Sequence, residues 1–222
     1  VIMIENQDIC IEFQNVSKNY GKVQALKNLS FDIKKGEIFG YIGPNGAGKT
    51  TTLKILVGLI KDYQGEVFIE GNNIKDEPLT LHRNIGYLPQ ECGFQEWRTV
   101  KMALTTFGKL SGITSIKLKG RIQDVLRQVG LTGVLNKKIT HLSGGMKQKL
   151  RLAQALLHKP RILILDEPMS GLDPSSRFQM KQIIRRLVKE NITILLSSHI
   201  LSDIEDITSN IGILNQGNIL KI

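Results

Sequence analysis

The chain has 222 residues, of which 41% are hydrophobic and 23% are charged, a balance that is ordinary for a soluble globular protein and disfavours intrinsic disorder. A chain of this length can bury a substantial core without disulfides or a structural metal, and its two cysteines, Cys10 and Cys92, have no metal-ligand spacing. The net charge of +10 leaves nucleotide phosphates, anionic lipid and nucleic acid open as partners, beside a merely solvated basic surface.

Signals for a membrane span or a signal peptide are not found in the sequence. Apolar runs stay well below the roughly 20 residues that cross a bilayer. The start VIMIENQD contains Glu5 and has no basic region before its apolar residues. We therefore expect a cytoplasmic protein that reaches a membrane only through another polypeptide.

The first ninety residues are predicted to consist largely of strands. Turn-forming residues separate three short apolar runs, so we expect strands at ICIEF, LSFDI and EIFGYI within residues 9–42. After Thr50, apolar residues recur about one turn apart as far as Ile60, which predicts a helix. Two further strands are expected at EVFIEG (66–71) and NIGYLP (84–89).

Three helices are expected between residues 92 and 158. The first runs from Thr99 to Leu110 with Thr99 as its N-cap, and the second carries an apolar stripe that ends at Gly130. The third runs from about Ser143 to His158. We interpret this block as a helical insertion between the strand-containing parts of the chain.

Strands and helices alternate again in the last third. RILILD (161–166) and TILLSS (193–198) are almost wholly apolar, as expected of strands buried on both faces of a parallel sheet. The helix between them is expected to begin at Asp173-Pro174, and residues 211–222 predict a hairpin. One face of this helix carries basic residues that we expect to be solvated: Lys181, Arg185 and Lys189. The alternation predicts a doubly wound α/β core.

Residues 43–50 read GPNGAGKT and match the phosphate-loop pattern GxxxxGK[ST]. The motif follows an apolar strand and opens a helix, so glycines, successive backbone N–H groups and a helix N-terminus can together bind phosphate oxygens. Lys49 can reach the β- and γ-phosphates, and Thr50 can ligate Mg²⁺. The residues that we assign to the nucleotide here are Gly43, Asn45, Gly46, Ala47, Gly48, Lys49, Thr50 and Thr51.

Further motifs make the chain resemble a known family. GPNGAGKTT is followed by LSGGMKQ (142–148), ILILDEP (162–168), SGLD (170–173) and His199, in the order found in ATP-binding subunits of ABC transporters. LSGG is the most specific element, because other phosphate-loop ATPases lack it. The sequence LSGGMKQKLRLAQALLHKP, with IGYLPQ and one nucleotide-binding unit, most resembles the drug and antibiotic exporter branch.

The resemblance implies a RecA-like P-loop NTPase core with an N-terminal antiparallel β subdomain and an inserted α-helical subdomain. Residues 1–91 and 159–222 would form the ATP-binding core with the β subdomain, and residues 92–158 the helical signature subdomain. Subunits of this branch often continue past such a hairpin, which leaves a longer chain and a minimal subunit open as alternatives.

The resemblance also implies roles for single residues. Asp166 would hold Mg²⁺, and Glu167 would act as the general base that polarises the attacking water. His199 would contact the γ-phosphate, and Gln90 would be a ligand of Mg²⁺ and of that water. Tyr20 would stack on adenine, with a surface aromatic residue as the alternative.

A second anion-accepting corner is expected where Ser143, Gly144 and Gly145 begin a helix, although a capped structural helix is the alternative. In the resembled family this corner closes over ATP from a second nucleotide-binding subunit, in a head-to-tail dimer with two ATPs, and Asp173 would help to couple the two sites. A homodimer and a heterodimer both stay open for this chain. Met169 stands where the family commonly has a small or β-branched residue, a departure that concerns local packing.

The implied function is an ATPase that drives translocation, most similar to export, by a separate transmembrane permease at the inner face of the cell membrane. The segment Glu91 to Trp97 would contact the permease, with Phe94 and Trp97 either anchoring it or belonging to the core. A DNA-repair or chromosome-organising ATPase is disfavoured, because the 94 positions from Lys49 to Ser143 contain no sustained heptads. An ABC-type ATPase without a transport role, associated with nucleic acid or cluster assembly, stays as the alternative, although nucleic acid is not the expected partner.

Overall fold

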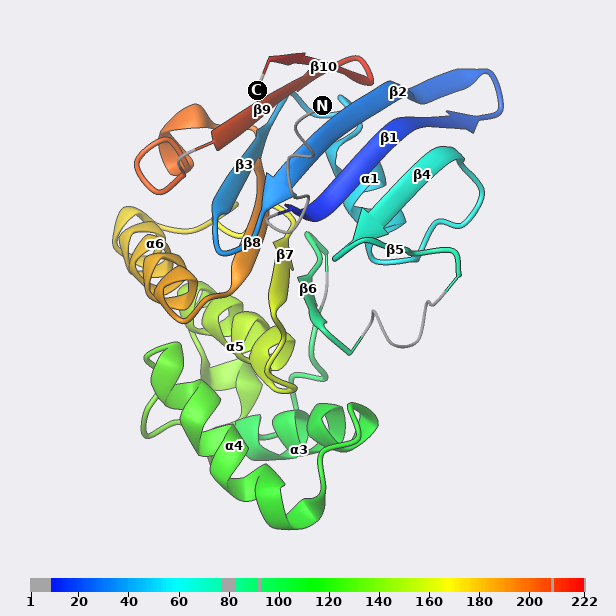
Figure 1. The fold of residues 1–222 in the computed structure, drawn as a ribbon. Helices are drawn as coiled ribbons and strands as arrows, with labels where there is room; N and C mark the ends of the chain where they lie inside the picture. The colour runs from blue at the N-terminus through cyan, green and yellow to red at the C-terminus, as the bar shows by residue number, and fades with distance from the viewer. Residues whose placement is uncertain (1–8, 77–82, 92, 209, 222) are drawn as a thin grey trace.

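The computed structural model describes residues 9–76, 83–91, 93–208 and 210–221, which form two sheets and a group of helices (Figure 1). The larger sheet has the strand order β10-β9-β3-β8-β7-β6, in which β9, β3, β8, β7 and β6 run parallel. The smaller sheet, β2-β1-β4-β5, is antiparallel. The predicted α/β class, with an antiparallel β part and added helices, is confirmed.

The elements have the following bounds. The antiparallel sheet contains β1 (Ile9–Tyr20), β2 (Val23–Lys34), β4 (Gln64–Ile69) and β5 (Asn72–Asn73). The larger sheet contains β3 (Ile38–Ile42), β6 (Ile85–Leu88), β7 (Ile162–Leu165), β8 (Thr193–Ser198), β9 (Asn210–Asn215) and the antiparallel edge strand β10 (Asn218–Lys221). The α-helices are α1 (Lys49–Leu56), α3 (Val100–Leu110), α4 (Ser115–Gln128), α5 (Gly144–Leu156) and α6 (Pro174–Lys189), with 3₁₀ turns at Ile139–His141 and Leu201–Asp203.

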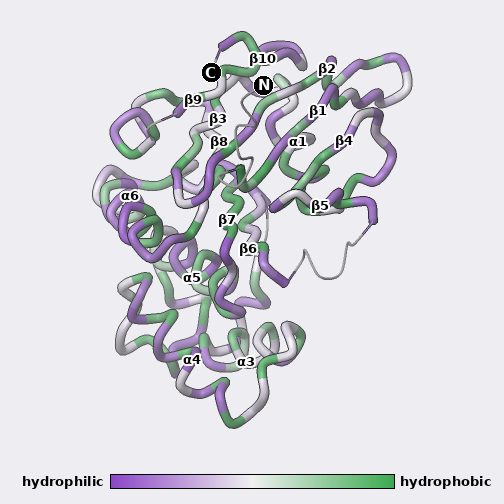
Figure 2. The backbone as a smooth tube through the Cα atoms, in the orientation of Figure 1, coloured by the Kyte–Doolittle hydropathy of each residue, from purple (hydrophilic) through white to green (hydrophobic). Residues whose placement is uncertain are grey.

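The larger sheet separates two hydrophobic cores, because successive side chains of a strand point to opposite faces. In β7, Ile162 and Ile164 belong to the core shared with α1 and the antiparallel sheet, whereas Leu163 and Leu165 belong to the core shared with α3 to α6. Figure 2 shows β7 as hydrophobic throughout. A strand that is covered on both faces has no polar alternation, which explains why RILILD is a continuous apolar run.

Three predicted helix starts are confirmed by their caps. The side-chain oxygens of Thr99, Ser143 and Asp173 each accept a hydrogen bond from the backbone N–H three residues later, at 3.2, 3.2 and 2.9 Å. These caps satisfy donors that have no partner within the helix. Gly130, with φ of 67°, follows the end of α4 as predicted.

Two element predictions need correction. The first helix ends at Leu56 and does not continue to Ile60, because Gly58 takes φ of 72° and terminates it. The β1–β2 hairpin is longer than the two apolar runs suggested, since each strand has 12 residues. Asn15 and Asn28 have φ of 50° and 46°, and the register of the hairpin shifts near them, so bulges interrupt the alternation that sequence reasoning looks for.

The basic face of α6 is not simply solvated, which corrects a third prediction. Lys181 Nζ donates to the carbonyl oxygen of Ser202 and to the carboxylate of Asp206, both at 2.7 Å. Arg185 donates to the backbone and side-chain oxygens of Asp206 at 2.7 and 3.0 Å. These residues attach α6 to the segment that follows β8, and Lys189 is the exposed one of the three.

Candidate functional site

The carboxyl ends of four parallel strands meet at one edge of the larger sheet. There β3 leads into the phosphate loop, β6 into Gln90, β7 into Asp166 and Glu167, and β8 into His199. Ligands of open α/β sheets bind outside this edge. The topology therefore brings together the phosphate loop and the residues predicted to act in catalysis and metal binding.

The phosphate loop depends on glycine at three positions. A Cβ on Gly43 would lie 2.3 Å from the carbonyl oxygen of Leu214, and Gly46 and Gly48 take φ of 80° and 110°. Gly48 is the N-cap of α1, so the first N–H groups of that helix are available to phosphate oxygens. The other predicted nucleotide residues differ in burial: Asn45 is exposed, Ala47 is buried, and Thr50 and Thr51 are half-buried.

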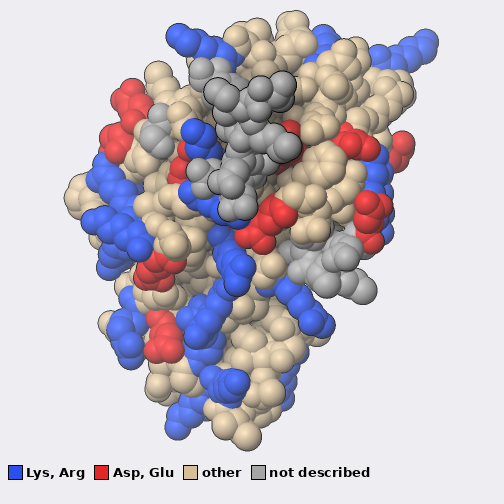
Figure 3. Space-filling model, in the orientation of Figure 1, with Lys and Arg blue, Asp and Glu red and all other residues tan. Residues whose placement is uncertain are grey.

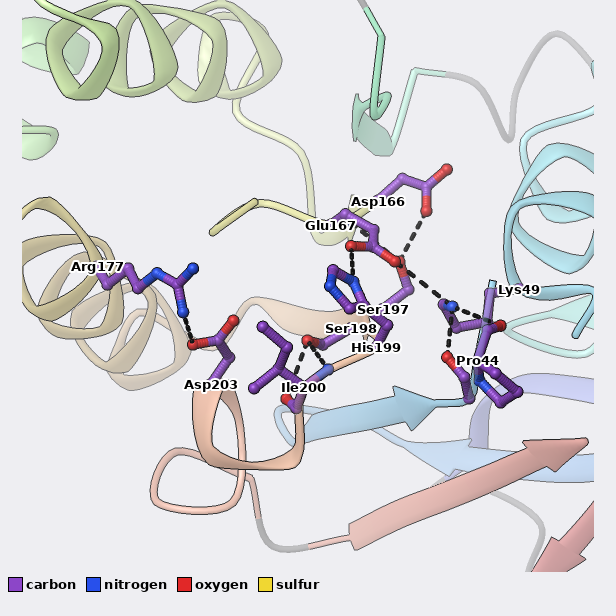
Figure 4. A network of polar contacts seen from close by, with 11 residues as sticks. Pro44, Lys49, Asp166, Glu167, Arg177, Ser197, Ser198, His199, Ile200 and Asp203 are labelled. Carbon is purple, nitrogen blue, oxygen red and sulfur yellow. Dashed lines mark hydrogen bonds and ion pairs between the residues drawn. The ribbon is translucent and has the colours of Figure 1, made fainter. Parts of the chain in front are cut away.

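Lys49, the first residue of α1, is only 5% exposed, and oxygen atoms surround its ammonium group. Nζ donates to the carbonyl oxygens of Gly43 at 2.6 Å and Pro44 at 3.1 Å, and it lies 3.4 Å from Oε1 of Glu167 (Figure 4). A buried ammonium requires such partners. Phosphate oxygens, which carry more charge than a carbonyl, would bind it more strongly.

Glu167 lies between two basic side chains. Its Oε1 faces Lys49, and its Oε2 is 2.5 Å from Nδ1 of His199. Its backbone φ of 52° falls in the left-handed region, a costly conformation that is common at functional sites. The His199 side chain is 36% exposed, so it connects the buried carboxylate to the surface of the site.

Asp166 is fully buried at the end of β7, and its two carboxylate oxygens differ. Oδ1 accepts a hydrogen bond from the Ser197 hydroxyl at 2.7 Å, whereas Oδ2 is buried without a hydrogen-bond partner among the described residues. Burial raises the pKa of the Asp166 carboxyl, and the hydroxyls of Ser197 and Thr50 oppose that rise. An unpartnered carboxylate oxygen near a threonine hydroxyl fits Mg²⁺, which prefers oxygen ligands and takes few of them from the protein.

The LSGG corner, Ser143 to Gly145, lies on the other face of the sheet from α1. Ser143 and Gly144 are exposed at the start of α5, which packs in one hydrophobic core while α1 packs in the other (Figure 1). A Cβ on Gly145 would lie 2.2 Å from Oγ of Ser176, so the start of α5 touches the start of α6, where Asp173 is also exposed. Within one chain, the LSGG corner is thus open to solvent.

The sequence left open whether Phe94 and Trp97 belong to the core or anchor a permease. Phe94 is half-buried against the helical core, with its ring 5.9 Å from that of Phe107 in an edge-on arrangement. Trp97 is 62% exposed, with the Arg98 guanidinium 5.1 Å from its ring. Phe94 therefore belongs to the edge of the core, and Trp97 is the residue that offers an aromatic surface.

Tyr20 lies at the end of β1, next to the hairpin turn, and is 49% exposed. The ammonium of Lys18 is 5.0 Å from the centre of its ring. The contact of Tyr20 with adenine stays a prediction.

Met169, which departs from the family pattern, is buried in the core that α3 to α6 share.

Sequence reasoning missed two polar residues that hydrogen-bond to the segment from Asp166 to Pro168. Ser197 bridges Asp166 and the backbone of Glu167, and the buried Gln148 of α5 donates to the carbonyl oxygen of Pro168 at 2.9 Å. Ser197 lies in β8, in which every residue is buried, and Gln148 is a buried residue of α5. A buried polar residue generally needs a partner, which is the signal that could have identified them.

A groove of about 950 Å³ lies away from this site, at the edge where β7 and β8 begin. The C-terminal ends of α4, α5 and α6 meet there, and cations are favoured at such ends. Arg121 shows this directly, because its Nε donates to the Leu157 carbonyl oxygen at 2.8 Å. Figure 3 shows Lys and Arg along α6 and the helical part of the molecule. The basic residues that line the groove are Arg121, Arg127, Lys159, Arg161 and Arg186.

Comparison with known proteins decides the family. The sequence model of the ABC transporter family matches residues 26–170, well over half of the chain. The chain belongs to the ABC transporter ATP-binding family. It is 43% identical to the uncharacterized ABC transporter ATP-binding protein YxlF of Bacillus subtilis, over 94% of this chain and 69% of that protein.

Two further relatives are named for transport of a compound or for resistance to one. The bacitracin transport ATP-binding protein BcrA of Bacillus licheniformis is 42% identical, over 95% of this chain and 68% of that protein. The linearmycin resistance ATP-binding protein LnrL of Bacillus subtilis is 38% identical, over 96% and 68%. A bacterial ABC transporter cassette solved as a dimer has 28% identity and a TM-score of 0.85, covering 95% of this chain and 97% of the cassette.

The chain is thus an ABC transporter ATP-binding subunit with a P-loop NTPase fold. Members of this family generally bind and hydrolyse ATP, and a cassette with 27% identity was solved in a post-hydrolysis state with ADP and phosphate. In the described parts of the chain, no helix combines the length and the apolar character needed to cross a membrane.

Proposed function

We propose that this chain hydrolyses Mg²⁺-ATP at an interface between two copies of itself and thereby drives export by a separate membrane permease. The observation that carries the proposal is the 3.4 Å contact between Lys49 and Glu167 at the sheet edge. The contact supports the proposal, because Lys49 would bind phosphate and Glu167 would activate water, and these two roles need neighbouring side chains.

ATP binding would begin with an exchange of partners at Lys49. Its ammonium would leave the carbonyl oxygens of Gly43 and Pro44 for the β- and γ-phosphates, and the backbone N–H groups of the phosphate loop would bind the remaining oxygens. Asn45, Ala47 and Thr51 would line the phosphates, and the ring of Tyr20 would stack on adenine.

The metal would be held by the Thr50 hydroxyl, the free Oδ2 of Asp166 and the amide oxygen of Gln90, which is exposed after β6. Bound Mg²⁺ neutralises charge that develops on the phosphate oxygens during transfer. Asp166 and Thr50 would hold this metal with charged and hydroxyl oxygens, and Gln90 would add a neutral amide oxygen.

Hydrolysis would use Glu167 as the base. When Lys49 moves to the phosphates, Oε1 of Glu167 is released to accept a proton from water, while Oε2 stays bonded to His199. The water oxygen bonds to the γ-phosphorus, the bond from that phosphorus to the ADP oxygen breaks, and ADP and phosphate leave. His199, partly exposed, would contact the γ-phosphate.

The second copy would complete the site. The exposed LSGG corner lies on the other face of the sheet from α1, so we expect no contact between this corner and ATP bound to its own chain. Because a related cassette forms a dimer, we propose that Ser143, Gly144 and Gly145 of one chain bind the ATP of the other. Asp173 lies beside that corner and would connect the two sites. ATP would then favour the closed pair, and hydrolysis would release it.

Transport would follow from movement of the helical part. We propose that residues 92–158 act as a unit that transmits closure to a permease at the inner face of the membrane, and that residues 1–91 and 159–222 form the ATP-binding core. Exposed Trp97 gives the permease an aromatic contact. Export is supported by the linearmycin resistance and bacitracin transport proteins among the relatives.

Purification of the tagged chain from membranes in mild detergent tests this function. We expect it to co-purify with a protein of several membrane spans, and we expect Trp97→Ala to weaken that association. Ile116→Ala, which removes another exposed apolar side chain, is the control. Recovery of nucleic acid in place of a membrane protein would contradict the proposal and favour the alternative, an ABC-type ATPase without a transport role.

A further inference from the structure

Ser197 is fully buried near the end of β8, between the two acidic residues of the site (Figure 4). Its hydroxyl donates to Oδ1 of Asp166 at 2.7 Å and accepts from the backbone N–H of Glu167 at 3.0 Å. A serine hydroxyl has one proton. Because the hydroxyl donates that proton to Asp166, its oxygen is free to act as the acceptor for the N–H of Glu167.

We propose that Ser197 is a positioning residue for ATP hydrolysis, which fixes the metal-binding oxygen of Asp166 and the backbone of Glu167 with one hydroxyl. This inference rests on the roles proposed above for the two acidic residues. Neither the phosphate-loop pattern nor the LSGG motif identifies Ser197, and its role follows from the two hydrogen bonds.

The bond to Asp166 determines which carboxylate oxygen is left for a metal. Ser197 occupies Oδ1, and Oδ2 stays buried without a hydrogen-bond partner in the described structure. A carboxylate bonded through one oxygen cannot rotate freely, so the other oxygen has a fixed direction. Outer-shell hydrogen bonds of this kind commonly change metal affinity or activity tenfold or more.

The bond to Glu167 supports an unusual backbone. With φ of 52°, Glu167 is in a region that residues other than glycine rarely adopt, and such a conformation persists only where its surroundings determine it. Ser197 holds its N–H, and two residues later in the chain His199 holds its carboxylate. The end of β8 therefore fixes Glu167 at both its backbone and its side chain.

Ser197→Ala removes the hydroxyl and nothing else of substance. We expect kcat to fall about tenfold and the Mg²⁺ concentration for half-maximal ATPase activity to rise about tenfold. Binding of a fluorescent ATP analogue, measured without turnover, should weaken in Mg²⁺ and stay unchanged in EDTA. If Ser197 acted only in packing, Ser197→Ala would weaken binding of the analogue equally in Mg²⁺ and in EDTA.

Two variants serve as controls. Ser198→Ala removes the neighbouring hydroxyl, which bonds the backbone of Ile200, and should keep the original Mg²⁺ dependence. Ser197→Thr retains a hydroxyl and should recover most of the activity lost in Ser197→Ala. If Ser197→Ala does not fold, Ser197→Cys, whose thiol is a weaker donor, should show a smaller shift in the same direction.

Unchanged Mg²⁺ dependence in folded Ser197→Ala or Ser197→Cys would overturn the inference, and so would an equal loss of nucleotide affinity in Mg²⁺ and EDTA. Asp166→Asn separates this failure from failure of the proposed site. If Asp166→Asn also keeps its Mg²⁺ dependence, the role of Asp166 is wrong. If it loses that dependence while Ser197→Ala does not, only the role of Ser197 is wrong.

Discussion

The phosphate loop and the LSGG corner both face phosphate in the proposed mechanism, yet they are built in opposite ways. Around the phosphate loop, Lys49, Asp166, Glu167 and Ser197 are buried and bonded to one another. At the LSGG corner, Ser143 is exposed, and its hydroxyl caps its own helix. The residues around the phosphate loop thus contact one another within a single chain, whereas the LSGG corner presents an exposed surface that, in the proposed mechanism, acts on the ATP of a second chain.

Because the two corners differ in this way, substitutions at the phosphate loop and at the LSGG corner should have different effects. Changes around the phosphate loop should alter nucleotide binding or chemistry in each single chain. Changes at the LSGG corner should leave a single chain able to bind ATP and should affect only what two chains do together. Substitutions at each corner therefore test whether nucleotide binding and the joint action of two chains can be separated.

The largest effect is expected from Glu167→Gln. The amide keeps the size of the side chain but cannot take a proton from water, so kcat should fall by about 10²–10⁴. ATP should still bind, because the substitution leaves Lys49 in the phosphate loop, where it can exchange its carbonyl partners for phosphate oxygens, and the unreacted ATP should hold two chains together. Phosphate release and size-exclusion chromatography with ATP measure both effects.

The exposed Glu205→Gln is the matched control and should behave as the unaltered protein. Turnover of Glu167→Gln near the original rate would show that the base lies elsewhere.

Lys49→Ala should reduce nucleotide affinity about 10–100-fold, since it removes a charged donor from the phosphates. The measurement is equilibrium binding of a fluorescent ATP analogue to the dilute chain, in which each molecule acts alone. Lys54→Ala, on the exposed side of the same helix, is the control. Because Lys49 is paired with buried Glu167, folding must be verified by circular dichroism; unchanged affinity in the folded variant would refute the phosphate-loop role.

Ser143→Arg should lower ATPase activity about tenfold or more, because a bulky cation would occupy the surface that meets the second chain. Equilibrium binding of ATP to the dilute chain should stay within about twofold, since the corner is open in the single chain. Ser115→Arg, in the first turn of α4 and also exposed, controls for the added charge. Full activity of Ser143→Arg would exclude action in trans.

The smallest effect is expected from Tyr20→Ala. Loss of a stacked ring is worth about 1 kcal/mol at an exposed position, so ATP affinity should fall roughly fivefold. Tyr20→Phe keeps the ring and should bind normally. If both variants bind ATP as the unaltered chain does, Tyr20 does not touch adenine.

Much of the fold could be predicted because its signals are local. The caps at Thr99, Ser143 and Asp173 act within one helical turn, and the apolar run of β7 reflects burial on both faces. The resemblance supplied a role for His199, whereas spacing alone placed it only after a strand. The structure then adds the contact of His199 with Glu167.

The features that could not be predicted depend on contacts between distant segments. Ser197 meets Asp166 only because β7 and β8 are neighbours in the sheet, an order that no single stretch of sequence encodes. In the same way, the partner of Lys181 and Arg185 is Asp206, more than 20 residues later in the chain. Helical periodicity identified the basic face of α6, but it could not identify Asp206 as the acidic residue that pairs with it.

Complementation between two inactive variants tests whether one ATP site is built from two chains. In a head-to-tail pair of Lys49→Ala and Ser143→Arg chains, one site combines the intact phosphate loop of one chain with the intact LSGG corner of the other. The account predicts that mixing the two variants restores ATPase activity to roughly a quarter of that of the unaltered protein, since half of the pairs are mixed and each has one good site. A mixture no more active than the separate variants would contradict an ATP site shared between two chains.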